Sequence, residues 1–407
     1  MLLISIKHQA SVKMQHTLSL LIFHLFGLPI MNTPRILISG AGIAGLSLAH
    51  CLEQQGIHYV IIEKHATSTH TSSGIALPFN AIQALRKMGL ADKVLAVAHQ
   101  VNDVTYTKKT GKVLAYANLL AAPLNQDKFI AMNRESLHAI LLEGIEPRIN
   151  FNTTIDSFLP TTNGVNVISS NSELNGKYDL VVSAEGIHSP LRKQCFPEEE
   201  TTIDHNIPNW RFVVDQPNHG LQPTYMLDRT ELFMVYPLSP DTLYCYAHIF
   251  DQTNQYESGS SSVHLRKIFS QFSEPARSLL KNIDDSSVIK SRLESVKHPY
   301  YKKGRIVFMG DASSACSPLL QQGAASAFED ALCLAKQLAN LPVADAISAY
   351  QNTRSPRVDW TVETSDKPVK LVKAMRNPIG AFIRNKVIQK KGPLNADGWK
   401  QLAKMPL

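Results

Sequence analysis

Residues 35–63 carry the pattern that decides the fold, RILISGAGIAGLSLAHCLEQQGIHYVIIE. The apolar run Ile36–Ile38 is typical of a buried parallel strand. A glycine-rich turn and a helix that ends at Gly56 follow it. A second strand is expected over Tyr59–Ile62, and it ends at an acid, Glu63. This order of strand, turn, helix and strand predicts a Rossmann-like βαβ unit in an α/β protein.

The glycine spacing in this stretch is G-x-G-x-x-G, which is typical of a dinucleotide site. Gly40 permits the tight turn, Gly42 lets the backbone approach a pyrophosphate, and Gly45 lets the helix pack closely on the sheet. The helix N-terminus offers free N–H groups to that anion. Glu63 is placed to accept hydrogen bonds from the ribose hydroxyl groups. An acid at this position favours the free ribose of FAD or NAD over the 2′-phosphate of NADP. The residues predicted to bind the dinucleotide here are Gly40, Ala41, Gly42, Ile43, Ala44, Gly45, Glu63 and Lys64.

A second cofactor segment is predicted from residues 303–338. The apolar run Ile306–Met309 is a buried strand that leads into Gly310 and Asp311. Gly323 opens a helix of small and apolar residues, which is a second helix N-terminus suited to the cofactor. Taken alone, the segment also fits an ordinary strand–loop–helix with a surface aspartate.

Together the two segments resemble the group A flavoprotein monooxygenases, the FAD-dependent aromatic hydroxylase family that includes the tetracycline-inactivating flavoenzymes. The resemblance covers most of residues 34–360. It implies that Gly310, Asp311, Pro318 and Gly323 hold the ribityl chain and the isoalloxazine ring of FAD. One departure is Gln321, which stands where the family commonly has glycine, and we expect it to crowd or reshape the pocket beside the flavin.

Two further family motifs add cofactor residues. The stretch 178–192 is similar to the family's Asp-Gly motif, with Gly186 conserving the glycine and Glu185 replacing the aspartate. We expect FAD binding to tolerate the longer acid. By the same resemblance Arg134 reaches toward the flavin, where its charge would stabilise the anionic reduced ring. A solvent-exposed arginine at a helix start is the alternative for Arg134.

The resemblance implies an FAD-dependent monooxygenase. In that family NAD(P)H reduces the flavin, O2 adds at C4a, and the C4a-hydroperoxyflavin hydroxylates an aromatic or enol-bearing, polyketide-like small molecule. The chain has no second G-x-G-x-x-G, so NAD(P)H is expected to dock transiently. Because the flavin supplies the chemistry, no catalytic side chain and no metal is predicted. Two alternatives stay open: a flavin-dependent reductase on the same fold and a non-enzymatic flavin-binding protein.

Segment boundaries follow from these motifs. An extension, 1–30, is expected to precede a working start at Met31, and the FAD-binding domain takes 31–105, 128–200 and 298–355. A mixed-sheet substrate domain takes 106–127 and 201–297. Basic helices, 356–407, are expected to begin after Pro356 and to break at each later proline of that segment. The candidate substrate contacts are Phe212, Met226, Phe233, Tyr236 and Tyr246.

The charge is concentrated in one part of the chain. The net charge is +7, but residues 366–407 hold ten Lys and Arg against two acids, and the rest has 31 basic and 32 acidic residues. A basic body is absent, so a nucleic-acid partner is not expected. The basic tail is interpreted as a solvated helical face, with contact to an anionic membrane surface or an acidic partner as the alternative. Five scattered cysteines favour a reducing, cytoplasmic location, and a monomer or homodimer is expected.

Overall fold

The computed structural model describes residues 34–67 and 73–406. The chain divides into the units 1–34 and 35–407, and every helix and strand named below belongs to the second unit. The extension predicted over 1–30 lies outside the described residues.

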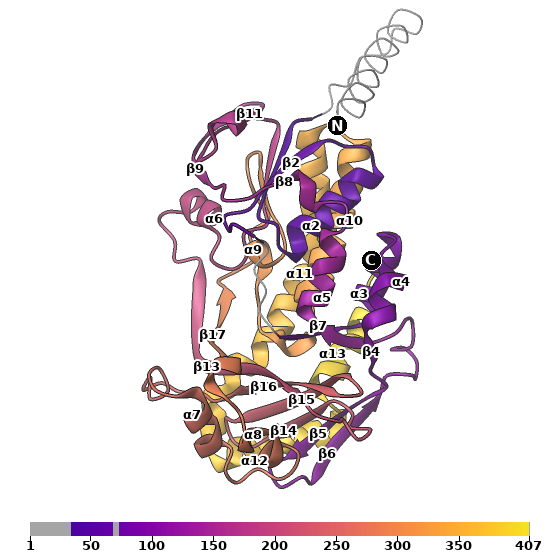
Figure 1. Ribbon diagram of the computed structural model, residues 1–407, viewed down its shortest axis with the longest axis vertical. Coiled ribbons are helices and arrows are strands. Elements are labelled where there is room, and N and C mark those ends of the chain that lie inside the picture. Colours follow the sequence, from indigo (N-terminus) through magenta and orange to yellow (C-terminus); the bar gives the residue numbers. More distant parts are fainter. Residues whose placement is uncertain (1–33, 68–72, 407) are drawn as a thin grey trace, which may run out of the picture. The chain divides into compact units, whose positions relative to one another are not determined.

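A six-stranded sheet is built around the strand predicted from the glycine-rich stretch (Figure 1). All of its neighbouring strands are parallel except the pair at one edge, β18 and β19. In the central register, Ile36 of β1 lies between Leu180 and Tyr59 of the two flanking strands. The strands in spatial order are β18 (Lys302–Lys303), β19 (Ile306–Phe308), β12 (Leu180–Ser183), β1 (Ile36–Ser39), β2 (Tyr59–Ile62) and β8 (Ile149–Asn150).

Strand β1 is apolar on both faces because both faces of the sheet are covered. Ile36 and Ile38 pack into a core shared with the helices α2 (Ile43–Gln54) and α10 (Gly323–Asn340). Leu37 points to the other side, into a core shared with a small antiparallel sheet. That sheet has the strands β11 (Gly176–Tyr178), β10 (Gly164–Ser169) and β9 (Ile155–Thr161).

A seven-stranded mixed sheet forms the other large layer (Figure 1). Its strands are antiparallel neighbours except for the parallel pair β14 and β5. Its strands in order are β17 (Ile289–Val296), β13 (Thr202–Asp215), β16 (Thr242–His248), β15 (Leu232–Ser239), β14 (Thr224–Leu227), β5 (Asp103–Lys108) and β6 (Val113–Asn118). The predicted boundary at residue 105 therefore falls inside a strand, and the division into a cofactor and a substrate domain stays a prediction.

The two faces of this sheet bury different side chains, as the period of two in a strand requires. Phe212 and Phe233 pack on one face against the helices α7 (Ser261–Ile268) and α8 (Ala276–Lys281). Tyr236 and Tyr246 lie on the opposite face, in a core that also contains Trp399.

Short elements join the two layers. These elements are a three-stranded antiparallel sheet and the helices α3 to α5. The contact with the seven-stranded sheet is close, because Tyr244 of β16 packs directly on the backbone of Gly74. A Cβ atom at Gly74 would lie 2.4 Å from the Tyr244 ring, so the glycine permits this contact. The elements are β3 (Gly74–Leu77), β7 (Ile130–Asn133), β4 (His99–Gln100), α3 (Phe79–Lys87), α4 (Ala91–Val97) and α5 (Arg134–Leu142).

The C-terminal helices differ from the prediction. Helix α11 runs without interruption over Val343–Leu371, with Pro356 and Pro368 inside it. The expected helix start after Pro356 and the expected break at Pro368 are therefore both wrong. A proline inside a helix costs about 3 kcal/mol. Buried contacts of Tyr350, Arg354 and Val358 along the helix offset that cost. The other two predicted breaks are present, before α12 (Pro378–Lys391) and α13 (Leu394–Leu402).

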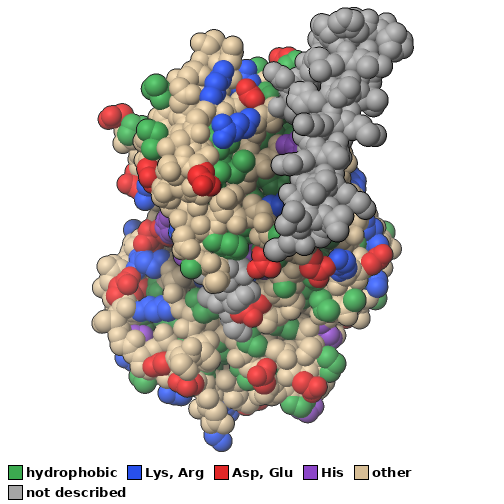
Figure 2. Space-filling model, turned by 45° about the horizontal axis from the view of Figure 1, so that its top comes forward, with side chains coloured by type: hydrophobic (Ala, Val, Ile, Leu, Met, Phe, Trp, Pro, Cys, Tyr) green, Lys and Arg blue, Asp and Glu red, His purple; other side chains and the backbone are tan. Residues whose placement is uncertain are grey.

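Charges of both signs are interspersed over the face drawn in Figure 2, without a large patch of either sign. Among residues 34–67 and 73–406, no helix is both long and apolar enough to cross a lipid bilayer.

Candidate active site

A cavity of about 1290 Å³ lies between the C-terminal edge of the six-stranded sheet and the tyrosine-bearing face of the seven-stranded sheet. Its lining brings together segments that are far apart in the sequence. All but one of the predicted cofactor residues line it: Gly40, Ala41, Gly42, Ile43, Ala44, Glu63, Lys64, Arg134, Glu185, Gly186, Gly310, Asp311, Pro318 and Gly323. Gly45 does not line it, because it packs behind the turn instead.

The glycine-rich turn has the close contacts that its pattern predicts. A Cβ atom on Gly45 would lie 1.9 Å from the carbonyl oxygen of Gly40, so helix α2 can approach the turn only without a side chain there. Gly40 has a φ of +106°, and a Cβ there would lie 2.6 Å from the carbonyl oxygen of Ala184. Gly42, in contrast, has nothing within 4 Å of its Cβ position. The backbone of Gly42 is therefore open to the cavity, as a pyrophosphate site requires.

Two helices begin at the cavity without a side-chain cap. Neither α2, after Gly42, nor α10, after Gln322, has a side chain that accepts a hydrogen bond from its first turn, and neither has an acid there. The first-turn N–H groups of such helices are donors, and the helix dipole adds positive potential. These two helix starts fit the anionic and carbonyl oxygens of a flavin dinucleotide.

Glu63 and Glu185 both support the turn. The Glu63 carboxylate accepts hydrogen bonds from the N–H groups of Ala41 (2.9 Å) and His65 (3.0 Å). Glu185 accepts from the hydroxyl of Ser39 at 2.7 Å and from that of Ser189 at 2.6 Å. Ser189 is the N-cap of helix α6 (Pro190–Cys195), so Glu185 connects β1 to that helix. The longer acid is thus accommodated by serine hydroxyls.

Asp311 follows a glycine with a positive φ just after β19. Gly310 has a φ of +55°, and a Cβ there would lie 2.7 Å from that of Ala44, so the glycine lets β19 close against α2. The Asp311 carboxylate faces the cavity, where solvent reaches it although protein surrounds it. Burial raises the pKa of Asp311, while the charges of Arg134 and Arg192 act in the opposite direction.

Arg134 begins helix α5 and faces the same cavity. Its backbone N–H donates to Ser73, and within the described part of the chain its guanidinium has no hydrogen-bonded partner. The guanidinium is exposed to the cavity and can therefore pair with a ligand. The acids, the arginine and the two uncapped helices fit FAD as a group, and the individual roles of these residues in binding it stay predictions.

The seven-stranded sheet contributes a wall of tyrosines to the cavity. Tyr236 and Tyr246 line it as candidates from the sequence, whereas Phe212, Met226 and Phe233 lie in the core behind the sheet. Alternation explains the split, because neighbouring positions of a strand face opposite sides. The aromatic and polar lining of the sheet also includes Tyr106, Tyr225, Tyr244, His248 and Arg211.

Gln321 lies between the flavin segment and the tyrosines. It follows the short helix η4 (Pro318–Leu320), has a φ of +49°, and donates from its Nε2 to the Tyr225 hydroxyl at 2.6 Å. The Tyr225 hydroxyl also hydrogen bonds with that of Tyr236 at 2.9 Å. Burial raises the pKa of Tyr225, which keeps the phenol protonated. Gln321 therefore shapes the cavity by holding a tyrosine pair.

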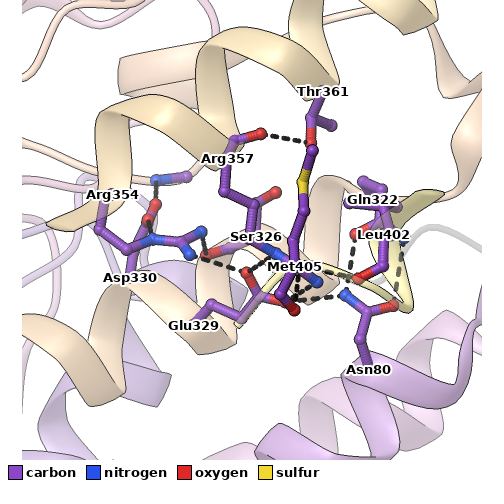
Figure 3. Close-up of polar contacts among 11 residues, drawn as sticks. Asn80, Gln322, Ser326, Glu329, Asp330, Arg354, Arg357, Thr361, Leu402 and Met405 are labelled. Atoms are coloured by element: carbon purple, nitrogen blue, oxygen red, sulfur yellow. Dashed lines mark hydrogen bonds and ion pairs between the residues drawn. The ribbon is translucent and has the colours of Figure 1, made fainter. Parts of the chain in front are cut away.

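A buried ion network behind the cavity was not anticipated from the sequence (Figure 3). Glu329 of α10 accepts from Arg354 (2.8 Å) and Arg357 (2.9 Å) of α11, and from Asn80 of α3 (2.8 Å). Burial by itself would raise the pKa of Glu329, but the two guanidinium groups lower it. Adjacent acids in an alanine-rich helix, with two arginines three positions apart in a later helix, were the signal available in the sequence.

The same network reaches the cofactor segment. Asp330 accepts from Arg354 at 2.7 Å and from the backbone N–H of Gly310 at 3.1 Å. Arg357 donates to the backbone oxygens of Leu402 (3.2 Å) and Met405 (3.3 Å). The network therefore links the end of β19 to the C-terminal helices.

Comparison with known proteins agrees with this geometry. Residues 33–365 match the model of the family described as FAD binding domain. The chain is 27% identical over 365 residues to 2-heptyl-3-hydroxy-4(1H)-quinolone synthase of Pseudomonas aeruginosa, covering 87% of this chain and 93% of that one. It is 25% identical over 364 residues to aurachin C monooxygenase/isomerase of Stigmatella aurantiaca, with the same coverage of 87% and 93%.

A solved structure has the same fold. Klebsiella pneumoniae HpxO complexed with FAD and uric acid superposes with a TM-score of 0.82 at 19% identity, over 92% of this chain and 98% of that one. The α/β fold and the resemblance predicted from the sequence are confirmed. The chain belongs to the FAD binding domain family and is a group A FAD-dependent monooxygenase, with FAD as its cofactor and NAD(P)H as its co-substrate.

Proposed function

We propose that the enzyme hydroxylates a planar aromatic or enol-bearing heterocycle that carries an apolar substituent, such as a 2-alkyl-4-quinolone. The observation that carries this proposal is the tyrosine wall. Tyr106 and Tyr225 stack with ring centroids 4.7 Å apart, and Tyr225 and Tyr236 meet edge to face at 6.0 Å. Such rings favour flat apolar ligands.

Apolar side chains extend the wall beyond the tyrosines. The apolar residues that line the cavity from the sheet include Leu227, Leu232, Met234 and Leu238. A ligand with a flat polar head and an apolar tail would match both parts. The relatives support this class, because one is named for a heptyl-hydroxyquinolone and HpxO is solved with uric acid.

Arg211 is the proposed partner of a ring oxygen. It lines the cavity from β13, and its guanidinium donates to the hydroxyl of Ser291 at 3.2 Å, while its Nε has no partner in the described part of the chain. A carbonyl or enolate oxygen of the substrate would satisfy this donor, which charge-assisted bonding makes favourable.

The chain's own residues would divide the work between the two ends of the cavity. The reduced flavin supplies the activation of O2 when it is bound. The uncapped helices and Arg134 would hold the cofactor and offset the negative charge of its reduced form. The tyrosine wall would orient the substrate and exclude water.

The free cysteines, all present as thiols, support the proposed cytoplasmic location.

The experiment follows NADH and NADPH oxidation, O2 uptake and peroxide release with a panel of 4-quinolones, phenols, aromatic acids and polyketides. We expect one class to accelerate oxidation and to yield a product with one added oxygen atom. Acceleration without O2 uptake would support the flavin reductase, which the relatives do not favour. Peroxide formed in full stoichiometry, with no oxygenated product from any compound, would contradict the substrate class.

A further inference from the structure

Helix α12 has an exposed apolar face. Ile379, Phe382, Ile383 and Val387 are 66%, 61%, 56% and 40% exposed. Leu371, the last residue of α11, is 51% exposed. The helical residues occupy positions i, i+3, i+4 and i+8, which lie on one side of a helix. Within the described part of the chain, no other segment covers this face.

The opposite face of α12 already anchors the helix to the protein. Ala381 and Ile388 are buried, and Ile388 joins the core that contains Trp399. Arg384 donates to the backbone oxygens of Asp228 and Arg229 from this inner side. The helix therefore has apolar residues on both sides, and only the inner side is covered by protein.

The charge around the exposed face is entirely positive along the chain. Residues 367–391 contain eight Lys and Arg and no acid. Lys386 and Lys390 fall on the exposed face itself, and Lys386 lies over the Phe382 ring at 5.7 Å. The nearest acid before this segment, Asp366, is buried and accepts from the N–H of Ser317 at 2.7 Å. A face that combines apolar side chains with lysines complements anionic lipid.

The face continues into the cavity. Leu371, Ile383 and Val387 are exposed and also line the cavity, together with Met375 and Leu394. The apolar surface therefore borders the opening through which the cavity meets the outside.

We propose that α12 and the preceding turn η5 (Val372–Arg376) dock the enzyme on an anionic lipid bilayer, with the opening of the cavity at the lipid surface. Ile379 and Phe382 enter the boundary between headgroups and acyl chains, and Lys386 and Lys390 bind headgroup phosphates. Contact of this kind needs no spanning helix. Only the purpose of the docking, delivery of an apolar substrate, rests on the proposed function.

The test is sedimentation of the FAD-loaded, full-length enzyme with vesicles of phosphatidylcholine alone or mixed equally with phosphatidylglycerol. We expect binding to the mixed vesicles, and a loss of at least about tenfold in partitioning for I379N/F382N, because two apolar side chains leave the bilayer. K386S/K390S should lose about fivefold for each lysine, on anionic vesicles only. Neither variant changes a residue that lines the cavity.

The matched control is L159N/I168N, which removes two equally exposed apolar residues, 65% and 55%, from the distant strands β9 and β10. Its partitioning should equal that of the unchanged enzyme. The proposal is overturned if the enzyme does not bind anionic vesicles at low salt. It is also overturned if the control variant loses as much vesicle binding as I379N/F382N does. A dimer by light scattering that I379N/F382N dissociates, without vesicle binding, would show that a second copy covers the face. Because the readout is binding, it is independent of any failure to find a substrate.

Discussion

The two ends of the cavity present different kinds of group to a ligand. At the cofactor end the backbone does most of the work, through the glycine turn at Gly40–Gly45 and the uncapped starts of α2 and α10. At the proposed substrate end side chains line the wall, through tyrosines on alternate positions of the seven-stranded sheet. Backbone recognition tolerates very few residue types, whereas side-chain recognition can change with single substitutions. We therefore expect the first end to be shared within the family and the second to select the substrate.

The largest expected effect is at the cofactor end. G45A places a Cβ 1.9 Å from the Gly40 carbonyl, where neither backbone segment can yield. We expect a loss of about 5 kcal/mol in the free energy of unfolding, and protein without flavin. G42A is the matched control, because its Cβ meets nothing within 4 Å. It should keep the stability of the apoprotein and lose FAD affinity. Flavin absorbance per chain and urea denaturation measure both, and equal stability of G45A and G42A would contradict the argument.

The ion network tests whether the cofactor end depends on the C-terminal helices. E329Q leaves two buried guanidinium groups without their shared carboxylate, which should cost about 3 kcal/mol. Denaturation with guanidinium chloride would measure the loss in the free energy of unfolding. E173Q, at an exposed position, is the control. A variant as stable as the parent would show that the network is replaceable by neutral hydrogen bonds.

A pH effect is expected on the substrate sheet. Burial lowers the pKa of His248 from 6.5 to about 4, so the folded protein holds this imidazole neutral. Between these values the unfolded chain binds more protons, and stability should therefore fall as the pH drops from about 6.5 to about 4. We expect a contribution of about 2 kcal/mol over that range. The H248N variant should show a flatter profile in thermal melts across this range, and an unchanged slope would exclude His248 as the cause.

The smallest effect on stability is expected at Gln321, where we also expect an effect on activity. Q321G removes a side chain from a residue with a φ of +49° and also removes the hydrogen bond to Tyr225. Relief of the left-handed conformation and loss of the bond should nearly cancel, so stability should change by less than about 1 kcal/mol. Peroxide release per NAD(P)H should rise because Tyr225 is no longer held. Y225F is the companion variant, and effects of Q321G and Y225F that simply add would show that the pair does not act together.

The cofactor end was predictable because its requirements are local. Gly40, Gly42 and Glu63 sit at fixed intervals within one βαβ unit, and the strands around them form where the sequence places them. The replacement of aspartate by Glu185 was visible in the sequence, but its hydrogen bond from Ser39 was not, because the neighbouring strand that carries Ser39 is 146 residues away along the chain.

The substrate end and the long helix were less predictable because they depend on tertiary contacts. Tyr236 and Phe233 lie on opposite faces of the sheet, and only the face with Tyr236 lines the cavity. The period of two in a strand separates the two faces but does not show which one lines the cavity. The proline at 356 indicates a helix start locally. The buried pairs of Arg354 and Arg357 with Glu329 stabilise a continuous helix instead, and these partners are remote in the sequence.

Residues 394–405 also bear on the order in which the protein is made. Trp399 donates to the backbone oxygen of Leu320 beside the flavin segment at 2.9 Å, and a Cβ on Gly398 would lie 2.4 Å from the Leu320 side chain. Leu402 and Met405 supply acceptors to Arg357. Gly398, Trp399, Leu402 and Met405 leave the ribosome after every residue that lines the cavity. A nascent chain can therefore fold its glycine-rich unit early, but it cannot complete the cavity until this stretch has emerged.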